Sequence, residues 1–262
     1  MTRPTDIEVA LAAAAAGAAV VRAAYGAAVV RHAKAGLDFA TDTDLEAERA
    51  ILEVVARERP DDARVGEESG GDAAPGRRWL VDPLCGTLNF AARTPLVAVN
   101  VALVGADAPA AVSADPIAGE AFWTDGSRTC VRVEGADEPL LPSGRSRLVD
   151  VNCDGPPDRP SRGAQLLTDG AFRAAFGPRV LSSTLALAWV AAGRRAGYVS
   201  DGTFTDNVHV AAGIDLCRSA GCVVTDLAGA PLGTGRGLVA AADAETHARL
   251  VDLVRPHLDG LA

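Results

Sequence analysis

An acid, a thiol and a hydroxyl stand within six residues of one another in the stretch WLVDPLCGTLNF, residues 79–90. Asp82 ends a short apolar run, and Cys85 and Thr87 follow on either side of Gly86. The apolar run is typical of a buried strand, which ends here because proline cannot donate to a β-ladder. The pattern predicts either the rim of an active site at a strand exit or a tight turn with a buried cysteine.

Carboxylates elsewhere in the chain could join Asp82. Glu67 and Glu68 precede a glycine-rich loop, Asp44 lies in the first turn of an expected helix, and Asp206 lies where a later helix is expected to open. Carboxylates from separate loops are the ligands that a hard cation such as Mg²⁺ requires. A solvated surface for the two glutamates and simple charge matching at a helix N-terminus for Asp44 are the alternatives.

Two helices are expected before these residues. The Ala-rich residues 6–34 predict a long first helix, followed by a loop at 37–41. Thr43 and Glu46 have the spacing of a capping box, so a second helix is expected over residues 43–59. These helices would lie directly ahead of the segment that carries the chemistry.

Strands and alternating elements follow. Buried or strand-like segments are expected at 96–104 and 111–123, and the Pro/Gly-rich residues 154–162 suggest a linker between two halves, 1–150 and 151–262. The second half alternates strands at 180–182, 197–199, 222–226 and 237–241 with helices at 185–193, 206–220 and 244–258. This order predicts an α+β fold of layered helices and sheets.

The composition and net charge exclude some classes of binding partner. The chain has 262 residues, 48% of them hydrophobic, and a formal net charge of −9. Nucleic acids and anionic membranes are therefore not expected as partners. Five scattered cysteines indicate a reducing compartment, and the thirteen apolar residues 9–21 are too short to span a bilayer. We expect a cytoplasmic protein.

The motifs together resemble the inositol monophosphatase family, the Mg²⁺-dependent, lithium-sensitive phosphatases. Residues 66–69 match its GEES loop, and residues 79–90 match its W-[IV]-[IV]-D-P-[IL]-D-G-T-x-N-F signature. Residues 41–44 resemble its V-T-x-x-D helix start, and residues 211–226 resemble its W-D-x-A-A-G…E-A-G-G-x-V-T-D segment. The resemblance covers nearly the whole chain in order and implies the family's layered αβαβα fold and a homodimer.

The resemblance also implies one metal site. Glu67, Asp82 and the carbonyl of Leu84 would bind a first Mg²⁺, and Asp44 would hold waters of a further metal position. Glu67 and Thr87 would orient the water that attacks phosphorus. Hard oxygen ligands and a hydroxyl beside the nucleophile suit that chemistry.

A small-molecule substrate is implied as well. The backbone N–H groups of Gly86 and Thr87 would receive its phosphate, and Arg194 is a further candidate for contact with an anion. There is no glutamate near Ser200 for contact with inositol, and Ala186 stands where some relatives keep an aspartate. The expected substrate is therefore a small sugar, polyol or other phosphorylated metabolite.

Two positions depart from the family pattern. Cys85 replaces an aspartate that binds the second metal, and His209 stands where the other aspartate of that metal is expected, with Asp206 one turn earlier as an alternative. A thiol is a poor Mg²⁺ ligand, so the second metal is expected to be lost or replaced by a softer ion such as Zn²⁺ or Mn²⁺. Cys85 and His209 could instead form a thiolate pair oriented by Asp206. A phosphatase that uses the first metal alone and a binding protein without turnover are the other two hypotheses.

Overall fold

The computed structural model describes residues 3–34, 36, 38–71, 75–154, 161–204 and 207–258. The chain divides into two compact units. The first comprises Met1–Pro139, Ser183–Leu185 and Val208–Leu216, and the second comprises Leu140–Ser182, Ala186–Asn207 and Cys217–Ala262. This division differs from the predicted one at 150/151, because a strand of the second sheet, β10 (Leu148–Asn152), crosses that position.

The first unit is built on a mixed sheet. In its described residues, this sheet has seven strands in the order β3-β4-β5-β6-β7-β8-β9. All neighbours are antiparallel except β3 and β4. The strands are β3 (Ala63–Gly66), β4 (Arg78–Cys85), β5 (Ala98–Val104), β6 (Ala110–Asp115), β7 (Glu120–Thr124), β8 (Thr129–Val133) and β9 (Ala136–Pro139).

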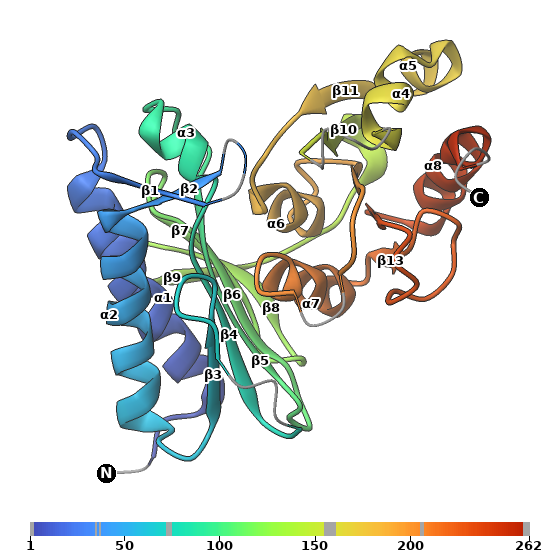
Figure 1. The fold of residues 1–262 in the computed structure, drawn as a ribbon. Coiled ribbons are helices and arrows are strands. Elements are labelled where there is room, and N and C mark those ends of the chain that lie inside the picture. The colour runs from blue at the N-terminus through green and yellow to red at the C-terminus, as the bar shows by residue number, and fades with distance from the viewer. Residues whose placement is uncertain are drawn as a thin grey trace. The chain divides into compact units, whose positions relative to one another are not determined.

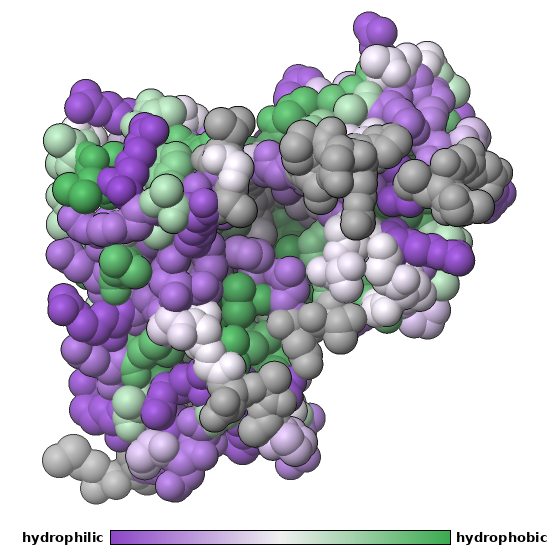
Figure 2. Space-filling view, viewed as in Figure 1, coloured by the Kyte–Doolittle hydropathy of each residue, from purple (hydrophilic) through white to green (hydrophobic). Residues whose placement is uncertain are grey.

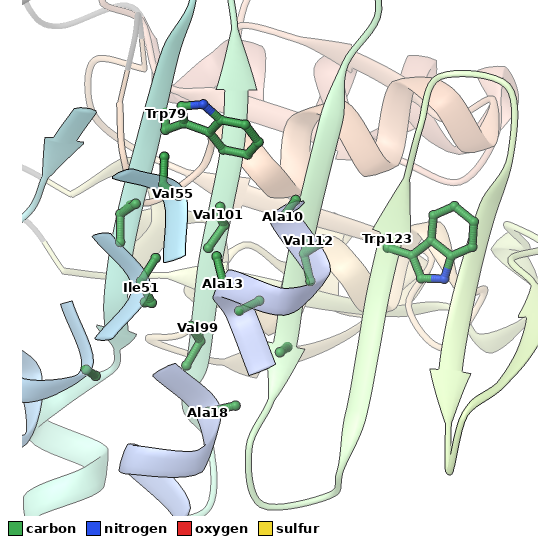
Figure 3. Packing of buried hydrophobic residues seen from close by; sticks show 14 of the residues in the cluster. Ala10, Ala13, Ala18, Ile51, Val55, Trp79, Val99, Val101, Val112 and Trp123 are labelled. Carbon is green, nitrogen blue, oxygen red and sulfur yellow. The ribbon is translucent and has the colours of Figure 1, made fainter. Parts of the chain in front are cut away.

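Two helices cover one face of this sheet. They are α1 (Asp6–Ala24) and α2 (Asp42–Glu58), which lie side by side against β4, β5 and β6 (Figure 1). The close-up in Figure 3 shows helix side chains, Ala10, Ala13, Ala18, Ile51 and Val55, packed over the strand side chains Val99, Val101 and Val112. The helices approach closely at Gly17, where an added Cβ would lie 2.6 Å from Ile51 Cδ1.

The apolar character of α1 follows from this packing. By length and composition alone, α1 could cross a membrane, but a buried core helix passes the same test. Here its buried residues belong to the core of the first unit. The surface over α2 is mainly hydrophilic (Figure 2), as expected for a helix with one buried side.

The start of the chain differs from the sequence prediction. The first helix ends at Ala24 rather than near residue 34, because Gly26 takes a left-handed conformation with φ of 85°. A short antiparallel pair follows, β1 (Arg31–Ala33) with β2 (Phe39–Thr41). The second helix starts at Asp42, one residue earlier than expected, since its capping box is Thr41 with Asp44 and not Thr43 with Glu46. The β1–β2 pair therefore occupies residues that the prediction placed in a helix and a loop.

The opposite face of the first sheet carries small and polar residues. Ala102 of β5 and Ala111 of β6 pack against Ala212 of α7 (Ala211–Ala220). Asp82, Asn100 and Ser113 lie on this same face in neighbouring strands. The predicted strands around the turn at 115–119 are confirmed as β6 and β7.

The second unit has its own sheet and core. In its described residues, the sheet has five strands in the order β11-β10-β12-β14-β13. The further elements are α4 (Arg162–Thr168), α5 (Gly170–Ala175), β11 (Gly177–Val180), α6 (Leu185–Ala191), β12 (Gly197–Ser200), β13 (Val223–Thr225), β14 (Leu238–Ala241), α8 (Ala244–Val254) and the 3₁₀ turns Gly144–Ser146 and Arg255–His257. Helices α4, α5 and α8 contribute Leu166, Phe172 and Leu250 to the core of this unit.

A short helix, α3 (Thr87–Ala91), follows β4 directly in the first unit. The strand, its exit and this helix together form the stretch on which the sequence analysis began.

Candidate active site

A buried glutamate of α2 holds the loop that follows β3. The Glu48 side chain is 3% exposed, and its carboxylate accepts the backbone N–H groups of Glu68 at 2.8 Å and Ser69 at 2.9 Å. Gly66 must be glycine here, because an added Cβ would lie 2.5 Å from both Glu48 oxygens. The Glu67 N–H donates to the Val81 carbonyl at 3.0 Å. These contacts fix the Glu67 backbone beside strand β4.

The exit of β4 places the next acid. Asp82 is fully buried and pairs with Asn100 of β5, after which the register shifts before Cys85. Gly86 then takes φ of 96°, a left-handed conformation that L side chains rarely adopt, and α3 begins at Thr87. The strand therefore continues past its predicted end at Asp82 to Cys85, with a register shift at the proline, and a sharp turn then starts a helix.

Three side chains of the first unit converge at this exit. Ligand atoms of Glu67, Asp82 and His209 all lie within 4.8 Å of one another. His209 Nδ1 lies 2.9 Å from Asp82 Oδ2 and 3.9 Å from Glu67 Oε2. The other Asp82 oxygen, Oδ1, is buried and has no hydrogen-bond partner among the described residues. The cluster thus holds a carboxylate oxygen that is available to a ligand.

Burial and the charges of this cluster shift the pKa values of Glu67 and His209. Burial raises the pKa of Glu67, and the nearby Asp82 carboxylate raises it further. Burial alone would lower the pKa of His209, but its hydrogen bond to Asp82 and the two carboxylate charges raise the pKa overall. The hydrogen bond to Asp82 and the nearby carboxylates thus favour the protonated imidazole.

Lys34 supplies a second cation from the residues that connect β1 and β2. Its Nζ lies 3.0 Å from Glu67 Oε1 and 2.7 Å from Glu68 Oε1. These carboxylates raise the pKa of Lys34, although burial opposes the shift. Three acids, Glu67, Glu68 and Asp82, thus face two basic side chains, Lys34 and His209.

Asp44 and Thr87 form a neighbouring pair. Thr87 Oγ1 lies 2.9 Å from Asp44 Oδ1 and 3.2 Å from the Leu84 carbonyl oxygen, and its hydroxyl proton can be donated to either. The other Asp44 oxygen accepts the Thr41 N–H at 2.7 Å as part of the helix capping box. Burial raises the pKa of Asp44, while its hydrogen bonds with Thr41 and Thr87 oppose the shift. Asp44 therefore both caps α2 and binds the hydroxyl at the start of α3.

Comparison with known proteins assigns this arrangement to a family. The model of the inositol monophosphatase family matches residues 4–259. The chain belongs to the inositol monophosphatase family. The resemblance found in the sequence motifs is confirmed.

Individual relatives agree with this assignment. Inositol-1-monophosphatase of Caulobacter vibrioides is 32% identical over 206 residues, which cover 74% of this chain and 78% of that protein. Inositol-1-monophosphatase ImpA of Mycolicibacterium smegmatis is 31% identical, covering 85% and 82%. The solved structure of SuhB from Bartonella henselae matches with a TM-score of 0.83 at 26% identity, covering 97% of this chain and 98% of that one. The predicted layered α+β fold is confirmed.

The first metal position of the family fits this chain. Glu67 and Asp82 present carboxylates side by side, and the buried Asp82 Oδ1 lacks a protein partner among the described residues. Oxygen donors of this kind suit Mg²⁺. The family's Mg²⁺ would therefore be held by Glu67, Asp82 and, as the motif implies, the Leu84 carbonyl.

The second metal position does not fit Mg²⁺. Cys85 Sγ accepts the Thr184 N–H at 3.3 Å, and burial and the nearby Asp82 charge raise the pKa of its thiol well above the usual range. His209, which the sequence analysis paired with Cys85, bonds to Asp82. A reactive thiolate requires a lowered pKa, so this environment speaks against Cys85 as an activated nucleophile.

Two other residues of the sequence prediction are Asp206 and Arg194. Asp206 lies outside the described residues. Arg194 belongs to the second unit, where it is exposed just after Gly193 and its N–H donates to the Trp189 carbonyl at 2.9 Å. The phosphate contact of Arg194 stays a prediction.

Two site residues were missing from the sequence prediction. Lys34 was placed at the end of the predicted first helix, residues 6–34. Glu48 follows Asp44 by one helical turn on the same buried side of α2, and that i, i+4 spacing was the available signal.

Proposed function

We propose that this protein hydrolyses the phosphate monoester of a small sugar or polyol metabolite and that it uses one divalent cation, held by Glu67, Asp82 and Leu84. The observation that carries the proposal is the convergence of Glu67, Asp82 and His209, with Asp82 Oδ1 unpartnered among the described residues. A carboxylate pair with an available oxygen suits a hard cation, and membership of the family supports hydrolysis of a phosphate ester.

His209 takes the place of the second ion in this proposal. Its imidazole is held protonated on Asp82, and Lys34 pairs with Glu67. With one divalent cation added, the basic side chains and the ion together exceed the charge of the three carboxylates of Glu67, Glu68 and Asp82. A second divalent ion would add further repulsion, and the thiol of Cys85, whose pKa is raised, offers it little compensation.

The reaction can be followed through the chain's own groups. A water oxygen forms a bond to phosphorus, and the bond from phosphorus to the ester oxygen breaks. Of the two protons of that water, one ends on the leaving oxygen, which departs as an alcohol, and the other ends on the phosphate product. Glu67 would accept a hydrogen bond from the attacking water. Asp44 binds the Thr87 hydroxyl proton, so that the Thr87 oxygen can accept a second hydrogen bond from the same water. When bound, Mg²⁺ would polarise the phosphoryl oxygens and neutralise developing charge.

The turn at Gly86 would receive the phosphate. Gly86 has no side chain, and its φ is 96°. An anion can therefore approach the N–H groups of Gly86 and Thr87 closely. The names of the Caulobacter and Mycolicibacterium relatives suggest an inositol phosphate as one substrate to test. The absence of an acid at Ser200 and Ala186 favours other polyol or sugar phosphates as well.

The test combines metal counting with a phosphatase screen. We expect purified protein to bind one Mg²⁺ or Mn²⁺ per chain by titration calorimetry, and to hydrolyse a member of a sugar and polyol phosphate panel. Glu67→Gln should lower kcat at least about 100-fold, because the variant loses a charged ligand. Glu46→Gln, an exposed position on α2, is the matched control and should change nothing.

Two results would overturn the proposal. One is binding of two divalent ions per wild-type chain; the other is hydrolysis that persists in Glu67→Gln. The double variant Cys85→Asp/His209→Asp should gain a second ion, because it restores two hard oxygen ligands. Tight binding of a phosphate ester without product under any metal would favour a binding protein instead.

A cytoplasmic homodimer completes the proposal. Both expectations come from the sequence and the family resemblance. Light scattering that gives twice the chain mass would support the dimer, and the single-chain mass would contradict it. Recovery of the native protein in the cytoplasmic fraction would support the location.

A further inference from the structure

Three buried polar atoms without a hydrogen-bond partner among the described residues lie in one row across the first sheet. They are Asp82 Oδ1 on β4, Asn100 Oδ1 on β5 and Ser113 Oγ on β6. Asp82 is paired with Asn100, and Asn100 is paired with Ser113, so all three side chains point to the same face. Each residue is 0% exposed.

The oxygens of Asp82 and Asn100 cannot hydrogen-bond to each other. Asp82 Oδ1 and Asn100 Oδ1 are both acceptors, and neighbouring strands lie about 4.8 Å apart. A buried polar atom left without a partner costs roughly 1–3 kcal/mol. Three such atoms in one row therefore point to a bound group that offers donors between them.

The amide nitrogen of Asn100 is held by Thr184. Its Nδ2 donates to Thr184 Oγ1 at 2.7 Å, and the Thr184 N–H donates to Cys85 Sγ at 3.3 Å. Thr184 belongs to the first unit, as do the three strands. With Nδ2 engaged, Oδ1 is left facing the row.

We propose that ordered water occupies this row and that, through it, Asn100 is a positioning residue for Asp82. One water donates to Asp82 Oδ1 and Asn100 Oδ1, which matches its two donors to two acceptors. A second donates to Asn100 Oδ1 and accepts from the Ser113 hydroxyl. A chain of this length is expected to bury about ten waters, so two in one polar row are well within the ordinary number.

The water would fix the carboxylate that the proposed function uses. His209 engages Asp82 Oδ2, and the water engages Oδ1, so the plane of the carboxylate is held at both oxygens. Each carboxylate oxygen has a second lone pair, which remains for a metal ligand bond. This role rests on the proposed function, but the presence of the water does not.

A crystal structure of the wild-type chain at about 1.7 Å resolution is the direct test. We expect ordered density within hydrogen-bond distance of Asp82 Oδ1, Asn100 Oδ1 and Ser113 Oγ. A dry row, with the Asn100 amide reversed so that Nδ2 donates directly to Asp82, would overturn the proposal. This result does not depend on whether the protein binds Mg²⁺ or hydrolyses anything.

Calorimetry with Mn²⁺ tests the positioning role. Asn100→Leu removes the amide that anchors the water, and the affinity for Mn²⁺ should fall about 10–100-fold, the usual cost of losing an outer-shell partner. In Ser113→Ala, which lies one water further from Asp82, the affinity for Mn²⁺ should fall about threefold. Unchanged affinity in a folded Asn100→Leu variant would refute the role.

A third variant keeps the test decisive if Asn100→Leu does not fold. Asn100→Ser retains a hydroxyl in the row and should keep the water while losing less affinity. If the wild type binds no Mn²⁺, the proposed function fails, while the density still decides whether the row holds water.

Discussion

Glu48 should stabilise the first unit by holding the 66–69 loop, and the contacts allow the size of this effect to be worked out. Glu48→Ala removes two charge-assisted hydrogen bonds, to the N–H groups of Glu68 and Ser69. Such bonds contribute about 1.5–3 kcal/mol each, so the free energy of unfolding should fall by at least about 3 kcal/mol. Glu53→Gln, exposed on the same helix, is the control and should change it by less than about 0.5 kcal/mol.

The same contact can be tested from the glycine. Gly66→Ala would place a Cβ 2.5 Å from both Glu48 carboxylate oxygens, which should cost about 2 kcal/mol as overpacking. In a Glu48→Ala background the clashing atoms are gone, so Gly66→Ala should then cost less than about 1 kcal/mol. The two substitutions should therefore be non-additive by about 1 kcal/mol or more.

Urea unfolding of the wild type, both single variants and the double variant provides the four free energies. The reasoning would be refuted by additive effects within about 0.5 kcal/mol, or by a loss below about 1 kcal/mol in Glu48→Ala. Either outcome would mean that water or the loop itself replaces the carboxylate at no cost. Affinity for Mn²⁺ in the same variants would show whether the loop also positions Glu67.

Three further predictions concern single side chains. Thr87→Val keeps the shape but removes the hydroxyl bound by Asp44, and we expect kcat to fall about 100-fold with a smaller change in KM, measured by steady-state kinetics. Cys85→Ser should leave kcat within about threefold in the same assay, because a buried thiol of raised pKa acts as a hydrogen-bond acceptor for Thr184 and not as a nucleophile; a loss of activity would restore the thiolate hypothesis. Burial lowers the pKa of His247, so the unfolded state binds more protons and stability should fall as the pH drops below about 6.5; melting temperatures of wild type and His247→Gln should converge in acid, and parallel curves would contradict this.

The sequence predicted the parts of the site that are encoded locally. The apolar run before Asp82, the proline after it and the glycine at 86 specify a strand and a sharp exit within a few residues, and the structure has both. The GEES loop was equally visible as a motif. These signals depend only on neighbours along the chain, which is why they could be read without a structure.

Contacts between distant segments were harder to predict. The alanine-rich N-terminus favours helix beyond residue 24, so the β1–β2 pair that carries Lys34 to the acids was missed. The partners of Glu48 are backbone N–H groups about twenty residues away, and no side-chain pattern shows them. The resemblance placed His209 at the site, but its bond to Asp82 depends on side-chain angles that a sequence does not record.

The separation of Asp82 from His209 has a consequence for synthesis of the protein. The two residues are 127 positions apart, and Thr184 also joins the first unit from the later part of the chain. A ribosome that has made only the first 139 residues has released every strand of the first sheet, but not the imidazole or the threonine that partner its polar face. The nascent sheet would expose the face around Asp82 and Asn100 until translation is nearly complete. A chaperone could bind this exposed face.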